Sequence, residues 1–329
     1  MTPSYLVGLI GAGIGTSLSP ALHEREAHHH GLRYLYRLVD LAGLGLGPES
    51  AGDLVRAARR LGFDGLNITH PCKQTVIAHL DELSVDAATL GAVNTVTFEG
   101  ERAIGHNTDW IGFAESFARG LPDAATRRVV QLGAGGAGAA TAHALLTLGA
   151  DHLTVADLDP SRARGLADAL VARFGPGRAS TVPLPPSLPP QPDPHGQQPD
   201  PHGPPPVTRG PQRGGAGEPG ERGEPADGRE LAELLRTADG LVHATPTGMA
   251  RHPGLPLPAG LLHPGLWVAD IVYRPLDTEL LRTARALGCR TLDGGGMVVF
   301  QAAHAFRLFT GAEPDTERML AHLTTLVTS

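Results

Sequence analysis

The sequence predicts an α/β protein of two domains, each an open sheet covered by helices. Three observations predict this architecture. The 329 residues suffice for two ordinary domains with buried cores. Short apolar runs bounded by glycine alternate with stretches of helical spacing, as in folds whose sheets are mostly parallel. One junction between such a run and a helix, at residues 133–138, is rich in glycine, which permits a tight turn directly before a helix.

The first domain, residues 1–110, alternates strands and helices from its N-terminus. Short runs rich in Leu, Ile and Val predict strands, and apolar residues three or four apart predict helices. Strands are expected at 5–10, in a run that closes at 39–41, at 65–68 and at 93–98, the last followed by a turn at Gly100. Helices are expected after Pro20, at 54–61 and at 76–88.

The second domain, residues 111–296, continues the same alternation. Strands are expected at 128–132, 153–156, 240–244, 267–271 and 290–292, and helices at 139–148 and 161–173. This order, with the glycine turn after the first strand, predicts a Rossmann domain. Residues 297–329 remain for C-terminal helices. The apolar stretch 297–309 is expected to pack back towards the first domain.

A proline-rich segment, residues 183–227, interrupts the second domain. It holds 15 of the 29 prolines and no Phe, Trp or Tyr, and it repeats QPDPHG at 191–196 and 198–203. Such a composition buries too little apolar surface to offset the entropy lost on ordering. We therefore expect a disordered surface insertion, whose deletion should leave activity largely intact.

Bulk composition restricts the partners. A net charge of −7 disfavours nucleic acid and acidic membrane as partners, and no apolar run approaches the roughly 18–20 residues of a membrane helix. The N-terminus lacks the basic flank of a secretory signal, and the two cysteines, Cys72 and Cys289, cannot form a disulfide framework, which fits the cytoplasm. No Cys/His spacing matches a closed zinc site, so no metal is expected. A small-molecule substrate is expected, and monomer and homodimer both remain open.

Lys73 is the only lysine among the 27 Lys and Arg residues. Arginine cannot lose its proton at any usable pH, whereas a partly desolvated lysine can. A single surviving lysine therefore indicates either a position where arginine cannot substitute or the chance survival of a surface residue.

Two glycine-rich stretches compete as a dinucleotide site. Residues 11–15, GAGIG, lack the third glycine at the required spacing. The second stretch has the complete pattern GxGxxG between a predicted strand and a helix, with Asp157 at the end of the next strand. It consists of Gly133, Ala134, Gly135, Gly136, Ala137 and Gly138. The sequence therefore predicts that the second stretch binds the cofactor, the alternative being an ordinary βα turn.

The three glycines of the pattern have separate physical roles. Gly133 permits the tight turn, Gly135 lets the backbone approach a pyrophosphate, and Gly138 lets helix and strand pack closely. The Asp157 carboxylate would accept bonds from the ribose of NAD and repel the 2′-phosphate of NADP. NAD is therefore the preferred expectation. NADP stays open because Arg162 and Arg164 are close in sequence.

Polar motifs follow predicted strands of the first domain, where ligands of open α/β sheets collect. They are SLS at 17–19, NITHPCK at 67–73, AVNT at 92–95 and GHNTD at 105–109. Together they offer hydroxyls, amides, one ammonium and one carboxylate, a set suited to a small polyhydroxylated acid. Further motifs are GAGGAG at 133–138, ATPTGM at 244–249, DIVYRPL at 270–276 and QAAHAF at 301–306.

These eight motifs, in this order, resemble those of shikimate and quinate/shikimate dehydrogenases over nearly the whole chain outside the insertion. The resemblance implies a catalytic pair of Lys73 and Asp109, which moves a proton while the nicotinamide cofactor moves a hydride. It implies that the substrate is bound by Ser17, Ser19, Thr69, Asn94, Asp109, Tyr273 and Gln301, the two serines holding the carboxylate. It implies that Thr245, Val272 and Met297 line the ribose and nicotinamide.

Each residue has a simpler interpretation when it is taken alone. Ser17, Ser19 and Asp109 are good helix N-caps, and Asn94 suits a turn. Tyr273 could pack at a strand end and Gln301 could be an exposed helix residue. The joint occurrence of the motifs outweighs these separate interpretations.

The sequence departs from the family in three places. His243 stands where the family often has Asn, which could alter a loop bond near the cofactor. Asp157-Leu158-Asp159 replaces the Asn-Arg-Thr of NADP-preferring members, and Ser19 leans towards shikimate rather than quinate. An aminoshikimate-type dehydrogenase and a non-catalytic NAD-binding sensor on the same scaffold remain alternatives.

Overall fold

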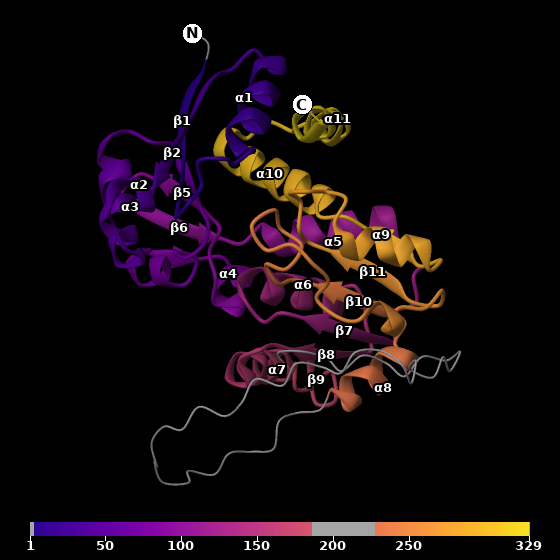
Figure 1. Ribbon diagram of the computed structural model, residues 1–329. Coiled ribbons are helices and arrows are strands. Elements are labelled where there is room, and N and C mark those ends of the chain that lie inside the picture. Colours follow the sequence, from indigo (N-terminus) through magenta and orange to yellow (C-terminus); the bar gives the residue numbers. More distant parts are fainter. Residues whose placement is uncertain (1–2, 186–227, 329) are drawn as a thin grey trace, which may run out of the picture.

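The computed structural model describes residues 3–185 and 228–328 and shows two sheets that lie one beside the other (Figure 1). Within the described residues each sheet has six strands. The first has the order β2 (Arg33–Asp40), β1 (Ser4–Gly11), β3 (Gly65–Ile68), β5 (Thr95–Glu99), β6 (Arg102–His106) and β4 (Glu82–Leu83). The second has the order β12 (Arg290–Leu292), β11 (Trp267–Asp270), β10 (Gly240–His243), β7 (Arg128–Leu132), β8 (His152–Ala156) and β9 (Ala179–Thr181). The predicted α/β class is confirmed.

The first sheet mixes parallel and antiparallel pairs. β1 is parallel to β2 and β3, and β4 is parallel to β6, whereas β5 is antiparallel to both β3 and β6. The pair of β5 and β6 is antiparallel because these strands form a hairpin through Gly100, whose φ of +61° suits glycine. The turn at Gly100 was predicted, but the returning strand was not.

Helices α1 (Ser19–His29), α2 (Leu41–Leu44), α3 (Ala51–Arg60) and α4 (Val85–Leu90) accompany the first sheet, with 3-10 turns η1 (Pro48–Ser50) and η2 (Thr75–His79). The expected helix at 76–88 is wrong, since η2, β4 and the start of α4 fill that span. Asp81 bonds through both its N–H and its side chain to the backbone of Ala103 in β6, and Ser84 then caps α4 by accepting from the N–H of Ala87. Tertiary pairing thus overrides a local helical spacing.

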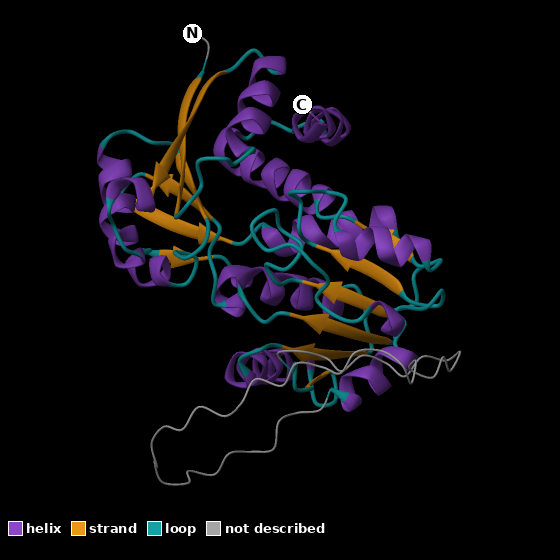
Figure 2. Cartoon of the chain, viewed as in Figure 1, coloured by secondary structure: helices purple, strands orange, loops and turns teal. Residues whose placement is uncertain are grey.

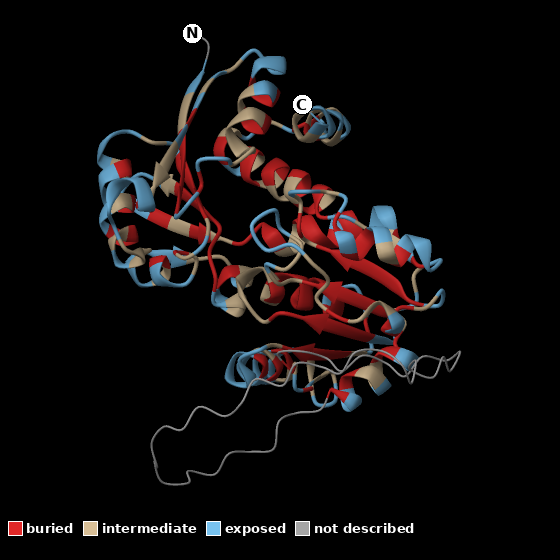
Figure 3. Ribbon diagram, in the orientation of Figure 1, coloured by how far each residue is buried: buried red, intermediate tan, exposed pale blue. Residues whose placement is uncertain are grey.

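The second sheet is parallel throughout, as predicted for a Rossmann unit. It is covered by α6 (Gly136–Thr147), α7 (Pro160–Phe174), α8 (Arg229–Thr237), α9 (Glu279–Ala286) and the short η3 (Ala259–Leu261). Figure 3 shows its central strands buried, which explains why they are nearly continuous runs of apolar residues.

The described chain reaches the start of the expected insertion. Leu184 is half-buried and packs against the core that contains Leu231 and Leu257, and Pro185 is buried. The described chain therefore continues to residue 185, near the expected start of the insertion. The remainder, residues 186–227, lies outside the described residues.

Two helices, α5 (Asp109–Gly120) and α10 (Gly295–Thr310), join the two sheets, and α11 (Thr316–Thr328) packs beside α1 and α10 (Figure 2). α5 leads from the first sheet to the second, and α10 packs along α5 and reaches α1 and β1. α11 is held to α1 by bonds from Arg318 to the buried Glu26. The predicted return of the C-terminal helix towards the first sheet is confirmed. In the part of the chain described, no helix combines the length and apolarity needed to cross a membrane.

Candidate active site

Lys73 and Asp109 meet between the two sheets. Lys73 follows β3, and Asp109 is the first residue of α5. The Nζ atom of Lys73 donates to Oδ2 of Asp109 at 2.5 Å. The side chains are 18% and 9% exposed, so the pair is shielded from bulk water but reachable. The two residues predicted to form an acid–base pair are therefore in direct contact.

Asn94 holds the Asp109 carboxylate from the other side. Its Nδ2 donates to Oδ1 of Asp109 at 2.8 Å and to Oγ1 of Thr108 at 2.9 Å, and its Oδ1 accepts from the N–H of Thr108 at 2.8 Å. Asn107 accepts from the N–H of Asp109 at 3.1 Å. Asn94 is buried within this network, in the bend directly before β5. Asp109 is not the N-cap of α5, because Thr108 occupies that position.

Asn67 and Tyr36 extend this network away from the reacting pair. Nδ2 of Asn67 donates to Oγ1 of Thr95 at 3.0 Å, and that hydroxyl donates to Oδ1 of Asn94 at 3.1 Å. The hydroxyl of Tyr36 donates to Oδ1 of Asn67 at 2.7 Å. Burial raises the pKa of the Tyr36 phenol, and a hydrogen bond with the Ser19 side chain opposes this rise. A continuous row of polar groups therefore links the predicted carboxylate subsite to the reacting pair.

Sequence reasoning gave no role to Asn67, Tyr36 or Thr95. Asn67 stands within the quoted NITHPCK motif, and a polar residue in a short strand that is otherwise apolar was a usable signal. Nothing in the sequence could pair Tyr36 with Asn67, because their contact depends on how β1 separates β2 from β3.

The two serines lie together at the start of α1. Their Oγ atoms are 3.2 Å apart, and Ser17 Oγ accepts from the N–H of Ser19 at 3.3 Å. Leu18 is the N-cap of α1 and no side chain caps the helix, so the capping interpretation of the serines is wrong. Arg274 donates to the carbonyl of Thr16 at 2.5 Å. This bond joins the loop that carries Tyr273 to the residue before Ser17.

The remaining predicted substrate residues, Thr69 and Gln301, are half-buried. Thr69 directly follows β3, and its N–H donates to the carbonyl of Ile10 at 2.9 Å. Gln301 lies on α10, where a Cβ added to Gly112 of α5 would be 2.7 Å from its backbone nitrogen. Gln301 is thus at the closest approach of the two connecting helices, and its interpretation as an exposed helix residue is wrong.

The glycine turn has the geometry that a dinucleotide requires. Gly133 has a φ of +103°, and a Cβ there would lie 2.5 Å from the carbonyl oxygen of Ala244. A Cβ on Gly138 would lie 2.3 Å from the carbonyl oxygen of Gly133, so only glycine allows this helix to start so close to its strand. A Cβ on Gly135 would meet nothing within 4 Å, which leaves the backbone open to a ligand. The turn and the first N–H groups of α6 therefore fit a pyrophosphate.

The glycine turn and the reacting pair are neighbours. A Cβ added to Gly136, at the first turn of α6, would lie 3.7 Å from Cδ of Lys73. The side chain of Lys73 thus passes the first turn of α6 and places its ammonium against the Asp109 carboxylate. This is the arrangement on which the enzymatic interpretation depends.

Asp157 is fixed at the end of β8. Its Oδ2 accepts from the N–H of Ala134 at 2.7 Å, and its Oδ1 accepts from the N–H of Asp159 at 2.9 Å. The side chain is bound to the glycine turn itself, and each oxygen retains a further lone pair for a ribose hydroxyl. Arg162 and Arg164 are exposed on α7.

The backbone N–H groups of the glycine-rich stretch at 11–15 are occupied by a side chain of the protein itself. Asp40 accepts from the N–H of Gly13 at 2.8 Å and from that of Ile14 at 3.0 Å. The bond from Gly13 is the largest cause that lowers the pKa of the Asp40 carboxyl. An internal carboxylate thus uses the N–H groups that an anionic ligand would need, and the preference for the second stretch is consistent with this.

Thr245, Val272 and Met297 lie at the carboxyl edge of the second sheet. Cγ2 of Thr245 would be 3.1 Å from a Cβ on Gly133, and Val272 is the second residue after β11. Met297 is on the first turn of α10 and is 8% exposed within a hydrophobic core. Thr245 is thus placed at the glycine turn, whereas Met297 contributes mainly to packing.

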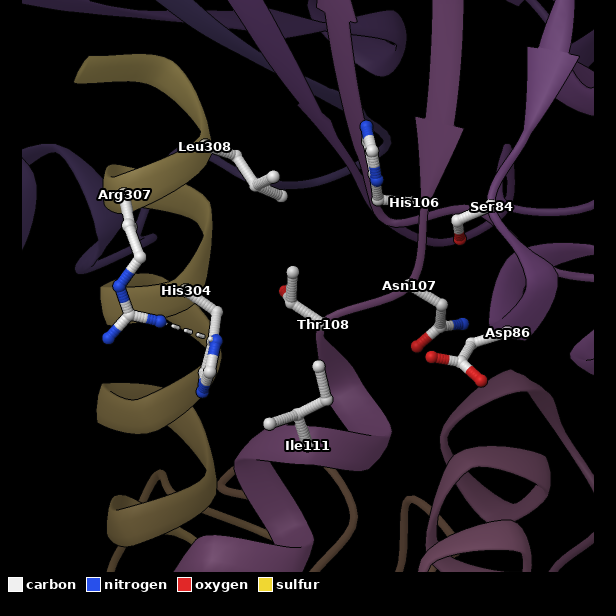
Figure 4. A pocket seen from close by; sticks show the side chains of 9 residues that line it. All are labelled: Ser84, Asp86, His106, Asn107, Thr108, Ile111, His304, Arg307 and Leu308. Carbon is white, nitrogen blue, oxygen red and sulfur yellow. Dashed lines mark hydrogen bonds between the residues drawn. The ribbon is translucent and has the colours of Figure 1, made fainter. Parts of the chain in front are cut away.

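A separate cavity of about 170 Å³ lies beside this site (Figure 4). It is lined by Ser84, Asp86, His106, Asn107, Thr108, Ile111, His304, Arg307 and Leu308. None of the predicted substrate or cofactor residues lines it, and it is smaller than the roughly 300 Å³ of common ligand pockets. Arg307 and His304 are engaged by Glu313 and Glu115. This cavity therefore does not define the candidate site.

Comparisons with known proteins agree with the geometry. Residues 9–96 match the shikimate dehydrogenase substrate binding domain, and residues 294–324 match the shikimate 5'-dehydrogenase C-terminal domain. A protein of Streptomyces avermitilis named shikimate dehydrogenase (NADP(+)) is 64% identical over 323 residues, which are 98% of this chain and 96% of that protein. The chain belongs to the shikimate dehydrogenase family.

Other members of this family differ in cofactor. A protein of Corynebacterium efficiens named quinate/shikimate dehydrogenase (NAD(+)) is 46% identical over 97% of both chains. The structure of quinate dehydrogenase from Corynebacterium glutamicum in complex with NAD has a TM-score of 0.80 at 41% identity, covering 98% of this chain and 100% of that one. The resemblance stated from the motifs is thereby confirmed, and relatives with NAD and with NADP both occur.

Proposed function

We propose that this shikimate dehydrogenase family member interconverts shikimate and 3-dehydroshikimate by hydride transfer with a nicotinamide dinucleotide, and that it also acts on quinate. The proposal rests on the contact between Lys73 and Asp109 at 2.5 Å, beside the glycine turn at Gly136. Retention of this bonded pair favours an enzyme over a non-catalytic sensor, which would need the glycine turn but no ammonium.

We propose that the substrate lies between the two serines and the reacting pair. The carboxylate would accept from Ser17 and Ser19, with Tyr273 beside them. The ring hydroxyls would contact Thr69, Asn94, Asp109 and Gln301. The polar row through Tyr36 and Asn67 supports this placement, because it stiffens the space between the two ends of the substrate.

In the direction of reduction, Lys73 donates a proton from Nζ to the oxygen of the carbonyl that becomes an alcohol. When bound, the nicotinamide supplies the hydride to the carbon of the same carbonyl. Asp109 orients the ammonium and accepts from the reacting hydroxyl. In the direction of oxidation, Lys73 Nζ takes the hydroxyl proton.

Cofactor binding is proposed at the glycine turn, residues 133–138, with Thr245, Val272 and Met297 towards the nicotinamide. The Asp157 carboxylate supports NAD as the preferred acceptor, because a 2′-phosphate beside it would be repelled. The exposed Arg162 offers the opposite attraction, and the relative at 64% identity is named for NADP. Initial rates with both cofactors at saturating shikimate test the preference. A tenfold or greater advantage of NADP in kcat/KM would overturn it.

Turnover of shikimate, quinate and aminoshikimate by the purified protein, each with NAD and NADP, tests the proposed activity. Shikimate is expected to have the highest kcat/KM. Preference for the amino analogue would favour an aminoshikimate-type dehydrogenase. Binding of the dinucleotide without turnover of any of the three substrates would favour the sensor.

We further propose that residues 1–110 form the substrate domain, 111–296 the dinucleotide domain and 297–329 the helices that return to the first. The cysteines at 72 and 289 are buried and free, which supports a reducing cytoplasm. Monomer and homodimer both remain compatible with the proposal.

A further inference from the structure

A buried histidine–carboxylate pair lies under the two loops that face the glycine turn. His243 ends β10 and Asp270 ends β11, and the two residues are partners in the parallel register. Nδ1 of His243 is 2.9 Å from Oδ1 of Asp270, and neither side chain is exposed. Neither residue belongs to the Lys73–Asp109 site, so the pair needs a separate explanation.

The second nitrogen of His243 contacts Thr245. Nε2 is 2.5 Å from Oγ1 of Thr245, and that same oxygen accepts from the N–H of Thr247 at 3.3 Å. The donor of the first hydrogen bond can be assigned by chemistry. A carboxylate only accepts, so Nδ1 of His243 carries the proton that bonds Asp270. An imidazole with that single proton would accept the hydroxyl proton of Thr245 at Nε2. With these donors and acceptors, the side chains of Asp270, His243 and Thr245 form one continuous chain of hydrogen bonds.

The orientation of Thr245 matters because of its other branch. With Oγ1 turned to His243, the methyl carbon Cγ2 faces Gly133, where a Cβ would be only 3.1 Å away. A threonine side chain has few χ1 rotamers, so fixing the hydroxyl also fixes the methyl group. The His243 bond therefore shapes the surface of the cofactor turn at its first glycine.

Asp270 fixes the neighbouring loop as well. Its Oδ1 accepts from the N–H of Val272 at 3.0 Å, and its Oδ2 accepts from the hydroxyl of Thr278 at 2.7 Å. Thr278 in turn caps α9. One buried carboxylate thus holds the loops after β10 and β11 in a single arrangement at the carboxyl edge of the sheet.

We propose that His243, held by Asp270, is a positioning residue for the dinucleotide: it sets the rotamer of Thr245 and so preorganises the wall of the site against Gly133. The proposal rests on the proposed function, since it assumes that a nicotinamide dinucleotide occupies this turn. The unsubstituted protein binds the dinucleotide with this wall already formed, so binding need not order it.

Two substitutions divide the roles of the imidazole nitrogens. His243→Asn keeps a polar atom near Nδ1, towards Asp270, but loses the contact with Thr245. His243→Gln keeps a polar atom near Nε2, towards Thr245, but loses Asp270. Thr245→Val removes the hydroxyl, and a methyl group cannot remain 2.5 Å from Nε2, so the side chain must rotate or shift.

The test is titration of each folded variant with NADH and with NADPH in the absence of substrate. Nicotinamide fluorescence reports binding and gives the Kd. His243→Asn and Thr245→Val are each expected to weaken the preferred dinucleotide about tenfold, because the relaxed loop must be reordered on binding. The double variant is expected to be no weaker than the worse single one, since His243 acts through Thr245. His23→Asn is the matched control: His23 is equally buried but lies in α1, so its thermal midpoint should fall while its dinucleotide Kd stays unchanged.

Several results would overturn the inference. A folded His243→Asn protein with unchanged Kd would do so, as would single losses that multiply in the double variant. Should His243→Asn fail to fold, Thr245→Val decides alone, and an unchanged Kd there also refutes the inference. In each of these cases the proposed function still holds if the unsubstituted protein binds the dinucleotide tightly. If the unsubstituted protein binds neither NADH nor NADPH, both the inference and the proposed function are refuted.

Discussion

Lys73→Ala is the substitution that most directly tests the proposed chemistry. It removes the side-chain ammonium that bonds Asp109 at 2.5 Å, while Asn94 still donates to the other carboxylate oxygen at 2.8 Å. The carboxylate therefore keeps its position, and the main loss is the proton donor. Removing a general acid costs roughly 10²–10⁴ in rate. We expect kcat to fall about 10³-fold, which corresponds to about 4 kcal/mol of barrier.

Stability and cofactor binding should change far less than kcat. Lys73 is 18% exposed, so its ion pair with Asp109 contributes less than a fully buried pair, and we expect a loss of about 1–2 kcal/mol on unfolding. Its stem only approaches Gly136, so the dinucleotide Kd should stay within about threefold. The assay is the initial rate of nicotinamide reduction with shikimate, together with thermal unfolding and dinucleotide titration.

Two further variants at this position separate proton transfer from charge. Lys73→Met keeps the length of the side chain without the ammonium, and Lys73→Arg keeps the cation but cannot release its proton. If proton transfer is the role of Lys73, both variants should be about as slow as Lys73→Ala. An Lys73→Arg enzyme with near-normal turnover would show that charge alone suffices, and near-normal turnover of Lys73→Ala would refute the mechanism.

Three other predictions follow from the contacts described. Asn94→Leu leaves Oδ1 of Asp109 without its amide donor and should lower kcat/KM by about 10–100-fold and the free energy of unfolding by about 1–3 kcal/mol; unchanged kinetics would contradict the role given to this amide. Gly138→Ala would place a Cβ 2.3 Å from the carbonyl oxygen of Gly133, so dinucleotide titration should detect no tight binding, and wild-type affinity would refute the geometry of the turn. Asp40 has a lowered pKa because the N–H of Gly13 bonds it. Its stabilising effect is present above the ordinary value of 3.8 and is lost as pH falls through the lower folded value, so the difference in thermal midpoint between the parent and Asp40→Asn should shrink on acidification.

The sequence predicted most strands because their apolar runs are short and bounded by glycine. The strands at 65–68, 128–132 and 290–292 lie where they were expected. The hairpin partner β6 and the two-residue β4 escaped prediction, because neither has a run long enough to stand out. The helical spacing at 76–88 misled for a related reason: the pairing of Asp81 with Ala103 is a contact between distant segments and leaves no local pattern.

Part of the candidate site could be predicted because its chemistry requires particular residue types. A single lysine, a complete GxGxxG pattern and polar motifs after strands each mark a residue type that the chemistry requires. The separate N-cap interpretation of Asp109 failed because a sequence shows which residues favour a helix start, but not which one occupies it. The supporting contacts of Tyr36 with Asn67, and of His243 with Asp270, depend on the order of strands in each sheet.

The sequence by itself determined the α/β class, because that class depends on local periodicity. Its motifs also predicted the cofactor turn and, through the family resemblance, the pair of Lys73 and Asp109. Only the tertiary structure decided that Lys73 Nζ meets Asp109 Oδ2 beside Gly136, and that Asp40 fills the other glycine-rich stretch. Distances between segments far apart in the chain are set by sheet order and helix packing, which no local pattern of residues encodes.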